Sequence, residues 1–451
     1  MIATILILYL LILIGLGFFA SKQIASPTDY FVAGKNKGTL LVMGSLLSSV
    51  LGGSAILGSV NLAMHQKWAS SWYLLAAAIG FLCLLPVVNR VFEHGKFTLG
   101  DLIGKFYGKT AHQLASVIIP MAWTGIVAAQ VIAAAKILFT LFALSYHWGV
   151  VIAALVFIIY TLIGGQISII KTDFMQMIIL LGGIFISALM LYFNHGNAAV
   201  SALGDSFPFN PSFEFVDLLV LLLSFSSTFV VGPDVYSRIF CARNAKVAKK
   251  SVLLSAVLLI PFAFVLTYLG VFATENLNAD QLHSVALIEV VKIYLPSWAV
   301  GIMAAALLSA VISSADTCLL TASIMLSELK NQNIDNRQSL KDTKKFVVLL
   351  GVVSMVIALY ATSIINSLLL ALAFYSGAFI VPIVLALWNV SVNKKNAPLA
   401  MLVGGVVALA GKLLSTYLNL PIGNYLLFSG FLLNFVILKW RSHAACASSE
   451  E

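Results

Sequence analysis

Charged residues are scarce in this sequence. They make up 10% of its 451 residues, whereas a soluble domain carries roughly 25%. So few charges cannot cover a water-facing surface, which excludes a soluble globular protein. Cysteine is scarce too, and the four residues have no metal-site spacing and lie outside the predicted outer loops. The four cysteines therefore indicate no zinc site and no disulfide framework; they are Cys83, Cys241, Cys318 and Cys446.

Long apolar runs take the place of charge. Hydrophobic residues make up 61% of the chain, and runs of about 20, the length of a bilayer-spanning helix, recur throughout. A transmembrane β-barrel would show alternating segments of about ten residues instead. The sequence therefore predicts an all-α polytopic membrane protein. The thirteen predicted spans are 2–20, 39–64, 69–89, 112–143, 147–165, 173–194, 214–236, 251–273, 296–327, 346–362, 364–388, 398–417 and 421–438.

The distribution of Lys and Arg predicts the orientation of these spans. With the N-terminus outside, 22 of the 26 Lys and Arg residues fall in cytoplasmic segments, and this bias places the C-terminus in the cytoplasm. We expect a multi-pass protein of the plasma membrane, of the bacterial inner-membrane type. No cytoplasmic segment is long enough to hold a soluble catalytic domain. The cytoplasmic segments are 21–38, 90–111, 166–172, 237–250, 328–345, 389–397 and the tail from Lys439.

Polar residues cluster within the span 296–327. On a helix, positions 310, 313, 314 and 317 share one face, and Asp316 lies beside them. A single serine at membrane depth usually bonds to its own helix or permits close packing. A group of hydroxyls beside an acid favours a cation site instead, because hard cations such as sodium prefer oxygen ligands.

Asp173 opens another span and allows two interpretations. It can stabilise the positive end of a helix dipole, or it can face Asp316 in the inner half of the membrane. In the second case a bound cation or a shared proton would relieve the repulsion between the two acids.

Two spans carry sequences that can interrupt a helix. Gly52 and Gly53 lie among serines, and this stretch is either an unwound segment with free carbonyls or a small-residue packing seam. The second stretch runs from Ser224 to Asp234 and includes Gly232-Pro233. Corresponding breaks at the start of two five-helix blocks, 39–194 and 214–388, predict an inverted-repeat transporter with its site between them.

These residues resemble those of the sodium:solute symporter family, which includes proline, pantothenate, sialic-acid and sugar carriers. The resemblance covers most of the chain, and the order and spacing of its motifs make it specific. The motifs are Asp29 to Lys35 (DYFVAGK), Lys96 to Leu99 (KFTL), Phe106 to Gly108 (FYG), Tyr160 to Gly165 (YTLIGG), Thr172-Asp173-x-x-Gln176, Gly232-Pro233-Asp234 with Arg238, and Ala310-x-x-Ser313-Ser314.

The resemblance implies a LeuT-type fold over a single domain, 1–451. Residues 2–20 would be an extra N-terminal helix, 39–194 and 214–388 the two inverted repeats, and 398–438 the peripheral C-terminal helices. It also implies Na+ as the coupling ion. The first sodium site would use the carbonyls of Ser48, Leu51 and Ala310 with the hydroxyls of Ser313 and Ser314. A second cation site would use Asp173, Ser313, Asp316 and Thr317, and the acid at Asp316 allows a proton there.

Family substrates bind beside the two breaks. The matching positions imply a substrate site made by Gly52, Ser54, Gln130, Phe225, Phe229 and Tyr375. Gln130 can alternatively hydrogen-bond between helices. Val50 and Gly52 stand where several members carry polar side chains, so the substrate is not indicated. Because we see no acid in either break, we expect an organic anion or a neutral solute.

The sequence therefore predicts a sodium-coupled symporter that imports a small organic solute by alternating access. A proton-coupled carrier of the same fold and a non-transporting solute sensor remain alternatives. An intramembrane enzyme would need a nucleophile–base pair or a metal cluster, and the seven histidines form none in the sequence, so we expect no enzyme. The sequence gives no sign of a nucleic-acid partner or an oligomeric state.

Overall fold

The structure is a computed structural model that describes residues 1–195, 200, 203–278, 285–331, 336–361, 364–418, 420 and 422–440. This part of the chain is helical, with two isolated β-bridges and no strand. Eleven of its helices are long and apolar enough to cross a membrane. The predicted class, an all-α membrane protein, is confirmed. The count of thirteen spans stays a prediction, because α4 with α5 and the whole of α9 each count once among the eleven.

The helices of the first half end near residue 195. They are α1 (Ile2–Ser21), α2 (Pro27–Val32), η1 (Ala33–Lys35), α3 (Thr39–Val50), α4 (Gly53–Gln66), η2 (Lys67–Ser71), α5 (Trp72–Leu84), α6 (Val88–His94), α7 (Leu99–Tyr107), α8 (Lys109–Phe142) and α9 (Tyr146–His195).

The second half contains shorter pieces around a second interruption. Its helices are α11 (Leu203–Ser206), α12 (Phe215–Leu221), η3 (Leu222–Ser226), α13 (Ser227–Val230), α14 (Pro233–Cys241), α15 (Ala245–Asn276), α17 (Ala286–Tyr294), α18 (Ser297–Lys330), α19 (Arg337–Tyr360), α20 (Ile364–Leu387), η4 (Lys394–Asn396), α21 (Ala397–Tyr417) and α22 (Ile422–Lys439).

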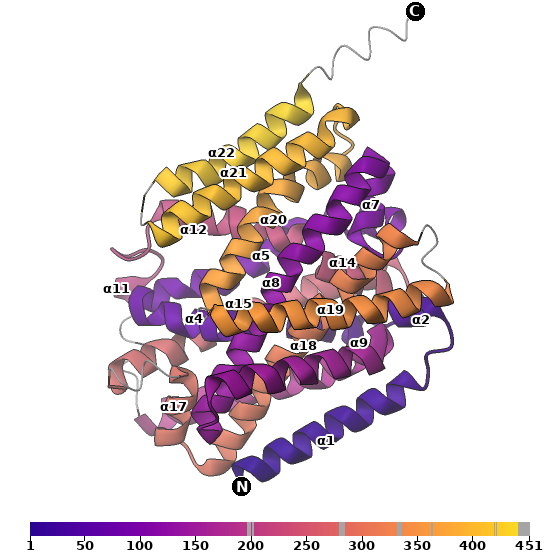
Figure 1. The fold of residues 1–451 in the computed structure, drawn as a ribbon. Helices are drawn as coiled ribbons and strands as arrows, with labels where there is room; N and C mark the ends of the chain where they lie inside the picture. The colour runs from indigo at the N-terminus through magenta and orange to yellow at the C-terminus, as the bar shows by residue number, and fades with distance from the viewer. Residues whose placement is uncertain are drawn as a thin grey trace, which may run out of the picture.

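Helix α18 lies in the interior of the bundle. It packs against α8, α9, α3 and α1. In its most apolar stretch 83% of the residues are buried, against 22% in α1. Figure 1 shows why: α1 runs along one edge of the molecule, and α21 and α22 lie together at the opposite edge beside α20. The polar residues of α18 are therefore held in a protein interior, away from lipid.

Helix α9 corrects one predicted loop. Its 50 residues would reach about 75 Å if straight, more than twice the roughly 30 Å bilayer core. The chain instead turns at Gly165, so two helices meet there. Its φ of 52° is a positive angle that glycine adopts without a steric penalty. The prediction of a cytoplasmic loop at residues 166–172 is therefore wrong, because the second helix begins directly after Gly165.

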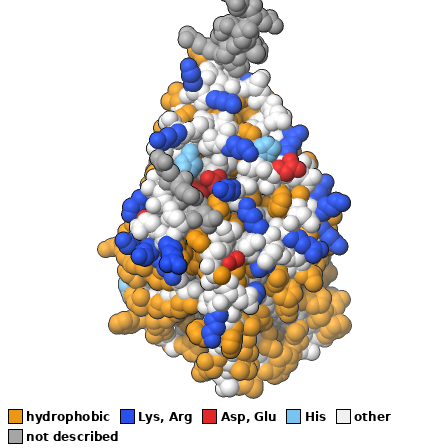
Figure 2. Space-filling model, turned by 90° about the vertical axis from the view of Figure 1, so that its right-hand side faces the viewer, with side chains coloured by type: hydrophobic (Ala, Val, Ile, Leu, Met, Phe, Trp, Pro, Cys, Tyr) orange, Lys and Arg blue, Asp and Glu red, His pale blue; other side chains and the backbone are white. Residues whose placement is uncertain are grey.

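Basic residues gather at one end of the molecule. Figure 2 looks onto the end at the right of Figure 1, near α2 and α7, and shows Lys and Arg side chains spread over it above a hydrophobic lower part. Arg238 is an exception, because it is fully buried at 0% exposure. Its assignment to a cytoplasmic segment was therefore wrong: α14 continues through it and carries it into the core.

Candidate functional site

The first interruption lies between α3 and α4. Leu51 and Gly52 are not helical, with ψ angles of 44° and 163°. The stretch is thus unwound, as one of the two interpretations predicted. Among the described residues, the carbonyls of Ser48 and Leu51 accept no hydrogen bond. Both residues are buried, so these two oxygens are free to bind a cation in the interior.

Two hydroxyls of α18 meet this interruption. Ser314 Oγ donates to the carbonyl of Ser49 at 2.7 Å, and Ser313 Oγ lies 2.8 Å from Ser48 Oγ. The structure therefore brings Ser48, Ser313 and Ser314 together. Ala310 lies in the same helix one turn before Ser314, next to a residue that touches the interruption.

Two glycines make this close approach possible. A Cβ on Gly52 would lie 2.3 Å from Ser314 Oγ, and a Cβ on Gly53 would lie 2.0 Å from Val311 Cγ2. Both distances are far below van der Waals contact. The Gly-Gly pair therefore both unwinds the helix and lets its backbone reach α18.

A buried ion pair lies directly beside these serines. Asp173 of α9 is 1% exposed and accepts from Arg238 Nη2 at 3.2 Å. Its carboxylate also accepts hydrogen bonds from Ser45 and Ser313. Arg238 Nε donates to the Ser45 carbonyl at 3.0 Å, and Arg238 Nη2 donates to Thr317 Oγ1. One guanidinium thus joins α14 to α3, α9 and α18.

Asp316 lies in a different environment. Its Oδ1 accepts from Thr161 Oγ1 of α9 at 3.3 Å, and no Lys or Arg of the described chain lies within ion-pair distance of it. Asp173 and Thr317, which the family resemblance assigns to a second cation site, are instead bound by Arg238. The positive charge that we expected from a bound cation or a shared proton is thus supplied to Asp173 by a side chain.

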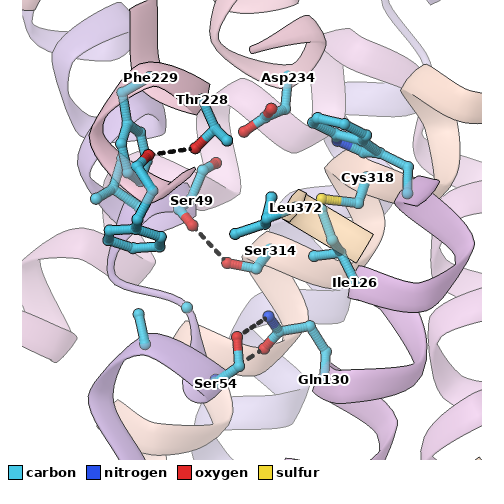
Figure 3. Close-up of a pocket in the computed structure, with 15 residues that line it drawn as sticks. Ser49, Ser54, Ile126, Gln130, Thr228, Phe229, Asp234, Ser314, Cys318 and Leu372 are labelled. Carbon is cyan, nitrogen blue, oxygen red and sulfur yellow. Dashed lines mark hydrogen bonds between the residues drawn. The ribbon is translucent and has the colours of Figure 1, made fainter. Parts of the chain in front are cut away.

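A cavity opens between the two interruptions, and Figure 3 shows residues that line it. Five of the six predicted substrate residues line it: Gly52, Ser54, Gln130, Phe225 and Phe229. The other lining residues are Ser49, Val50, Ala55, Trp123, Ile126, Thr228, Asp234, Ser314, Cys318 and Leu372.

The polar groups of the cavity come from both sides. Gln130 Nε2 donates to Ser54 Oγ at 2.6 Å, and Gln130 Oε1 accepts from the Ser54 amide at 3.2 Å. The predicted hydrogen bond between helices is therefore present, and Gln130 also lines the cavity, so contact with the substrate stays a prediction. Phe225 and Phe229 meet edge to face, with ring centres 5.0 Å apart, and form an apolar wall.

Asp234 corrects our account of the cavity's charge. It lies in the first turn of α14, directly after the second interruption at Val231 and Gly232, and it lines the cavity. The statement that neither break contains an acid was therefore wrong. No Lys, Arg or His lines the cavity in the described part of the chain.

Tyr375 is the one predicted substrate residue outside the cavity lining. Its hydroxyl donates to the carbonyl of Val231, at the end of α13. Its ring packs edge to face on Trp123, with centres 4.6 Å apart. Tyr375 therefore holds the second interruption in place, one layer behind the cavity.

Sequence reasoning missed several residues of this region. Trp123 and Leu372 lie in uninterrupted apolar runs, where nothing distinguishes a cavity wall from a lipid-facing position. Arg238 precedes several basic residues in the sequence, and the predicted cytoplasmic segment 237–250 includes it. Its spacing of four residues from Asp234, which places both on one face of a helix, was the signal that pointed inward.

Comparisons with known proteins agree with this geometry. The profile of the sodium:solute symporter family matches residues 30–404. The sodium/pantothenate symporter of Escherichia coli (strain K12) is 24% identical over 89% of this chain and 88% of its own length. The osmoregulated proline transporter OpuE of Bacillus subtilis (strain 168) is 23% identical over 95% and 92%.

Solved structures share the fold. A Na+-coupled sialic acid symporter in a substrate-bound outward-open state matches with a TM-score of 0.82 and 18% identity, covering 98% of this chain and 97% of that one. Mhp1, a nucleobase-cation-symport-1 family transporter, matches in a closed conformation with a TM-score of 0.64 and 12% identity over 94% and 95%. The family match spans most of the chain and agrees with the interrupted helices. This multi-pass membrane protein belongs to the sodium:solute symporter family, whose members are transporters coupled to Na+ and not enzymes.

Proposed function

We propose that the coupling sodium ion binds between the α3–α4 interruption and α18. Its ligands are the carbonyls of Ser48, Leu51 and Ala310 and the hydroxyls of Ser313 and Ser314. The observation that carries the proposal is the pair of buried carbonyls, at Ser48 and Leu51, that accept no hydrogen bond beside two serine hydroxyls. A monovalent cation satisfies oxygens that would otherwise be buried without a partner.

Substitution of both hydroxyls tests this site. Ser313→Ala with Ser314→Ala removes two of five ligands, so the sodium concentration for half-maximal uptake into proteoliposomes should rise at least tenfold. Ser323→Ala is the matched control, because this buried serine of α18 bonds only to its own helix, at the Leu319 carbonyl. An unchanged sodium requirement in the double variant would refute the site.

Arg238 leads us to propose a single sodium ion per transport cycle. Its guanidinium binds Asp173 and Thr317, two of the four residues assigned to the second cation site. A sodium ion there would have to displace a cation that is covalently part of the protein. A Hill coefficient of one for sodium supports this proposal, and a value near two contradicts it.

The cavity favours a neutral solute, or one with an ammonium group, over an organic anion. Asp234 is the charged residue among the lining residues, and Gln130 and Ser54 add hydrogen-bonding groups beside aromatic walls. An anion would have to approach this carboxylate in a cavity whose described lining contains no cationic side chain, which costs free energy in a low-dielectric site. The pantothenate, proline and sialic acid named for the relatives are the first solutes to test.

Asp234→Asn tests the role of this charge. The variant keeps the size of the side chain and removes its charge. If the substrate carries an ammonium group, uptake should lose at least tenfold in kcat/KM. If the substrate is neutral, the loss should be smaller and appear mainly in KM. The proposal would be contradicted if the wild-type protein took up an anionic solute faster than every neutral or zwitterionic solute tested.

We also propose that the basic end faces the cytoplasm. The Lys and Arg side chains of Figure 2 lie at the end that the positive-inside rule assigns to that side. Sodium would then enter from the opposite end, order the α3–α4 interruption against α18 and stabilise an outward-open state that binds solute. Coupling requires that each ligand binds one state more tightly than the other.

Uptake into proteoliposomes under separate sodium and proton gradients distinguishes the remaining alternatives. Accumulation driven by sodium alone supports the proposed symport. Accumulation driven by a proton gradient without sodium would instead point to Asp316, the acid of α18 that has no basic partner among the described residues. A complete lack of uptake over a broad solute panel would favour a sensor.

A further inference from the structure

Three potential metal ligands from different helices meet at the basic end of the molecule, away from the transport cavity. They are Asp101 of α7, His112 of α8 and Glu328 near the end of α18. One ligand atom of each lies within 4.8 Å of the other two, and His112 Nε2 lies 3.8 Å from Glu328 Oε2. None of the three lines the transport cavity.

Glu328 has an oxygen without a partner. Its side chain is 5% exposed, so it is almost fully removed from water. Oε2 accepts a hydrogen bond from Thr98 Oγ1 at 2.6 Å, whereas Oε1 accepts none. A buried carboxylate oxygen that has lost water and gained nothing is costly. A ligand at this position would satisfy it.

The two carboxylates of the cluster have no Lys or Arg partner among the described residues. Lys and Arg side chains are spread over this end of the molecule (Figure 2), yet none of the described ones lies within ion-pair distance of Asp101 or Glu328. In the deprotonated form that binds a metal, two carboxylates and a neutral imidazole carry two negative charges together. A bound divalent cation would neutralise this charge, whereas the described surface lysines lie too far away to pair with it.

We propose that Asp101, His112 and Glu328 bind a divalent transition-metal ion of the zinc type. Imidazole nitrogen and carboxylate oxygen are zinc ligands, and bond lengths of about 2.0–2.2 Å in a tetrahedral site place ligand atoms roughly 3.3–3.6 Å apart. The cluster needs only small side-chain rotations to contract to that spacing. His112 is partly exposed, so ions can enter from solvent and water can take the fourth position.

The local packing keeps the three helices close enough for such a site. Thr98 caps α7, because its Oγ1 accepts from the Asp101 amide at 3.2 Å while its hydroxyl donates to Glu328. Gly100 lies between them, and a Cβ there would be 2.8 Å from Ser116 Oγ of α8 and 3.2 Å from Glu328 Oε2. The absence of a side chain at Gly100 lets α7 rest directly on α8 and α18.

A metal at this position would restrain transport. It would link α7 and α8 to α18. The same helix carries Ser313 and Ser314, about four turns before Glu328. Alternating access requires groups of helices to move relative to one another. Bound zinc should therefore slow uptake without changing the sodium concentration for half-maximal uptake.

Zinc titration of the purified full-length protein in detergent, after chelator treatment, tests the proposal. Calorimetry should show Zn2+ binding, and His112→Ala should weaken it at least tenfold. Asp101→Asn should weaken it too, and both variants should relieve zinc inhibition of uptake. His94→Ala is the matched control, since His94 lies at the same end of the molecule on α6 and stacks on Phe106 of α7.

Three results would overturn the proposal. The first is no zinc binding by the wild type. The second is equal binding by wild type and His112→Ala. The third is tighter binding of Mg2+ than of Zn2+, which would exclude a role for the imidazole. Asp101 and His112 are both partly exposed, so their substitution leaves the core intact and keeps the test interpretable.

Discussion

The ion pair between Asp173 and Arg238 makes the sharpest prediction for stability. Arg238→Gln keeps most of the side-chain volume and removes the charge. Asp173, at 1% exposure, would then keep the hydroxyls of Ser45 and Ser313 but lose its countercharge. Breaking a buried ion pair on one side costs about 3–5 kcal/mol, because an uncompensated charge is left inside. The melting temperature should therefore fall by several degrees.

The second partner provides the decisive control. Arg238→Gln combined with Asp173→Asn removes both charges, and replacement of a whole buried pair is often close to neutral. The double variant should be more stable than Arg238→Gln alone. Lys292→Gln is the control for a more exposed pair. The side chains of Lys292 and Glu289 are 39% and 17% exposed and pair at 3.2 Å, and loss of such a surface pair costs about 0–1 kcal/mol.

Sodium adds a further signature to this experiment. Without the guanidinium, Asp173 and Thr317 become available to a second sodium ion. Sodium should then stabilise Arg238→Gln more than the wild type, by up to about 2.7 kcal/mol when its concentration is 100 times the dissociation constant. The double variant should lose this extra response because its carboxylate is gone.

The assay is intrinsic tryptophan fluorescence during heating, in sodium and in choline buffers of equal ionic strength. An Arg238→Gln variant as stable as the wild type would contradict a buried ion pair. A double variant less stable than either single variant would contradict the coupling between the two residues. Equal sodium responses in wild type and Arg238→Gln would refute the claim that Arg238 fills the second cation position.

Two further substitutions test the interruptions. Gly52→Ala places a Cβ 2.3 Å from Ser314 Oγ, so sodium-dependent uptake should fall at least tenfold. Gly182→Ala is the control, because its Cβ meets nothing within 4 Å, and it should leave uptake unchanged. Normal uptake by Gly52→Ala would contradict the close approach. Tyr375→Phe removes the donor to the Val231 carbonyl, which should cost about 0.5–1.5 kcal/mol of stability and slow uptake. Tyr360→Phe, at 86% exposure, is its control, and identical melting temperatures for the two variants would contradict the role of Tyr375.

The sequence predicted the parts of the fold that leave a local trace. Apolar length located the helices, and the Gly-Gly and Gly-Pro pairs located both interruptions, because glycine and proline act on the backbone where they stand. The serines of α18 were recognisable because polar residues at membrane depth are rare. The structure places Ser48, Ser313 and Ser314 together and lines the cavity with five of the six predicted substrate residues.

What the sequence did not give depends on packing between distant segments. Arg238 reads as a loop residue until three other helices are placed around it. Tyr375 matches a family position, but its hydroxyl bonds to the Val231 carbonyl while its ring packs on Trp123, and both partners are distant in the sequence. Asp101, His112 and Glu328 are separated by up to 227 residues in number and meet only in the folded chain. Such contacts have no local signature.

A high-resolution structure with thallium, a monovalent substitute for sodium that gives an anomalous signal, tests the central claim most directly. We predict one anomalous peak within coordination distance of the Ser48 and Leu51 carbonyls and the Ser313 and Ser314 hydroxyls, and its loss when excess sodium is added. A peak beside Asp316 alone, or none between α3 and α18, would contradict the proposed coupling site.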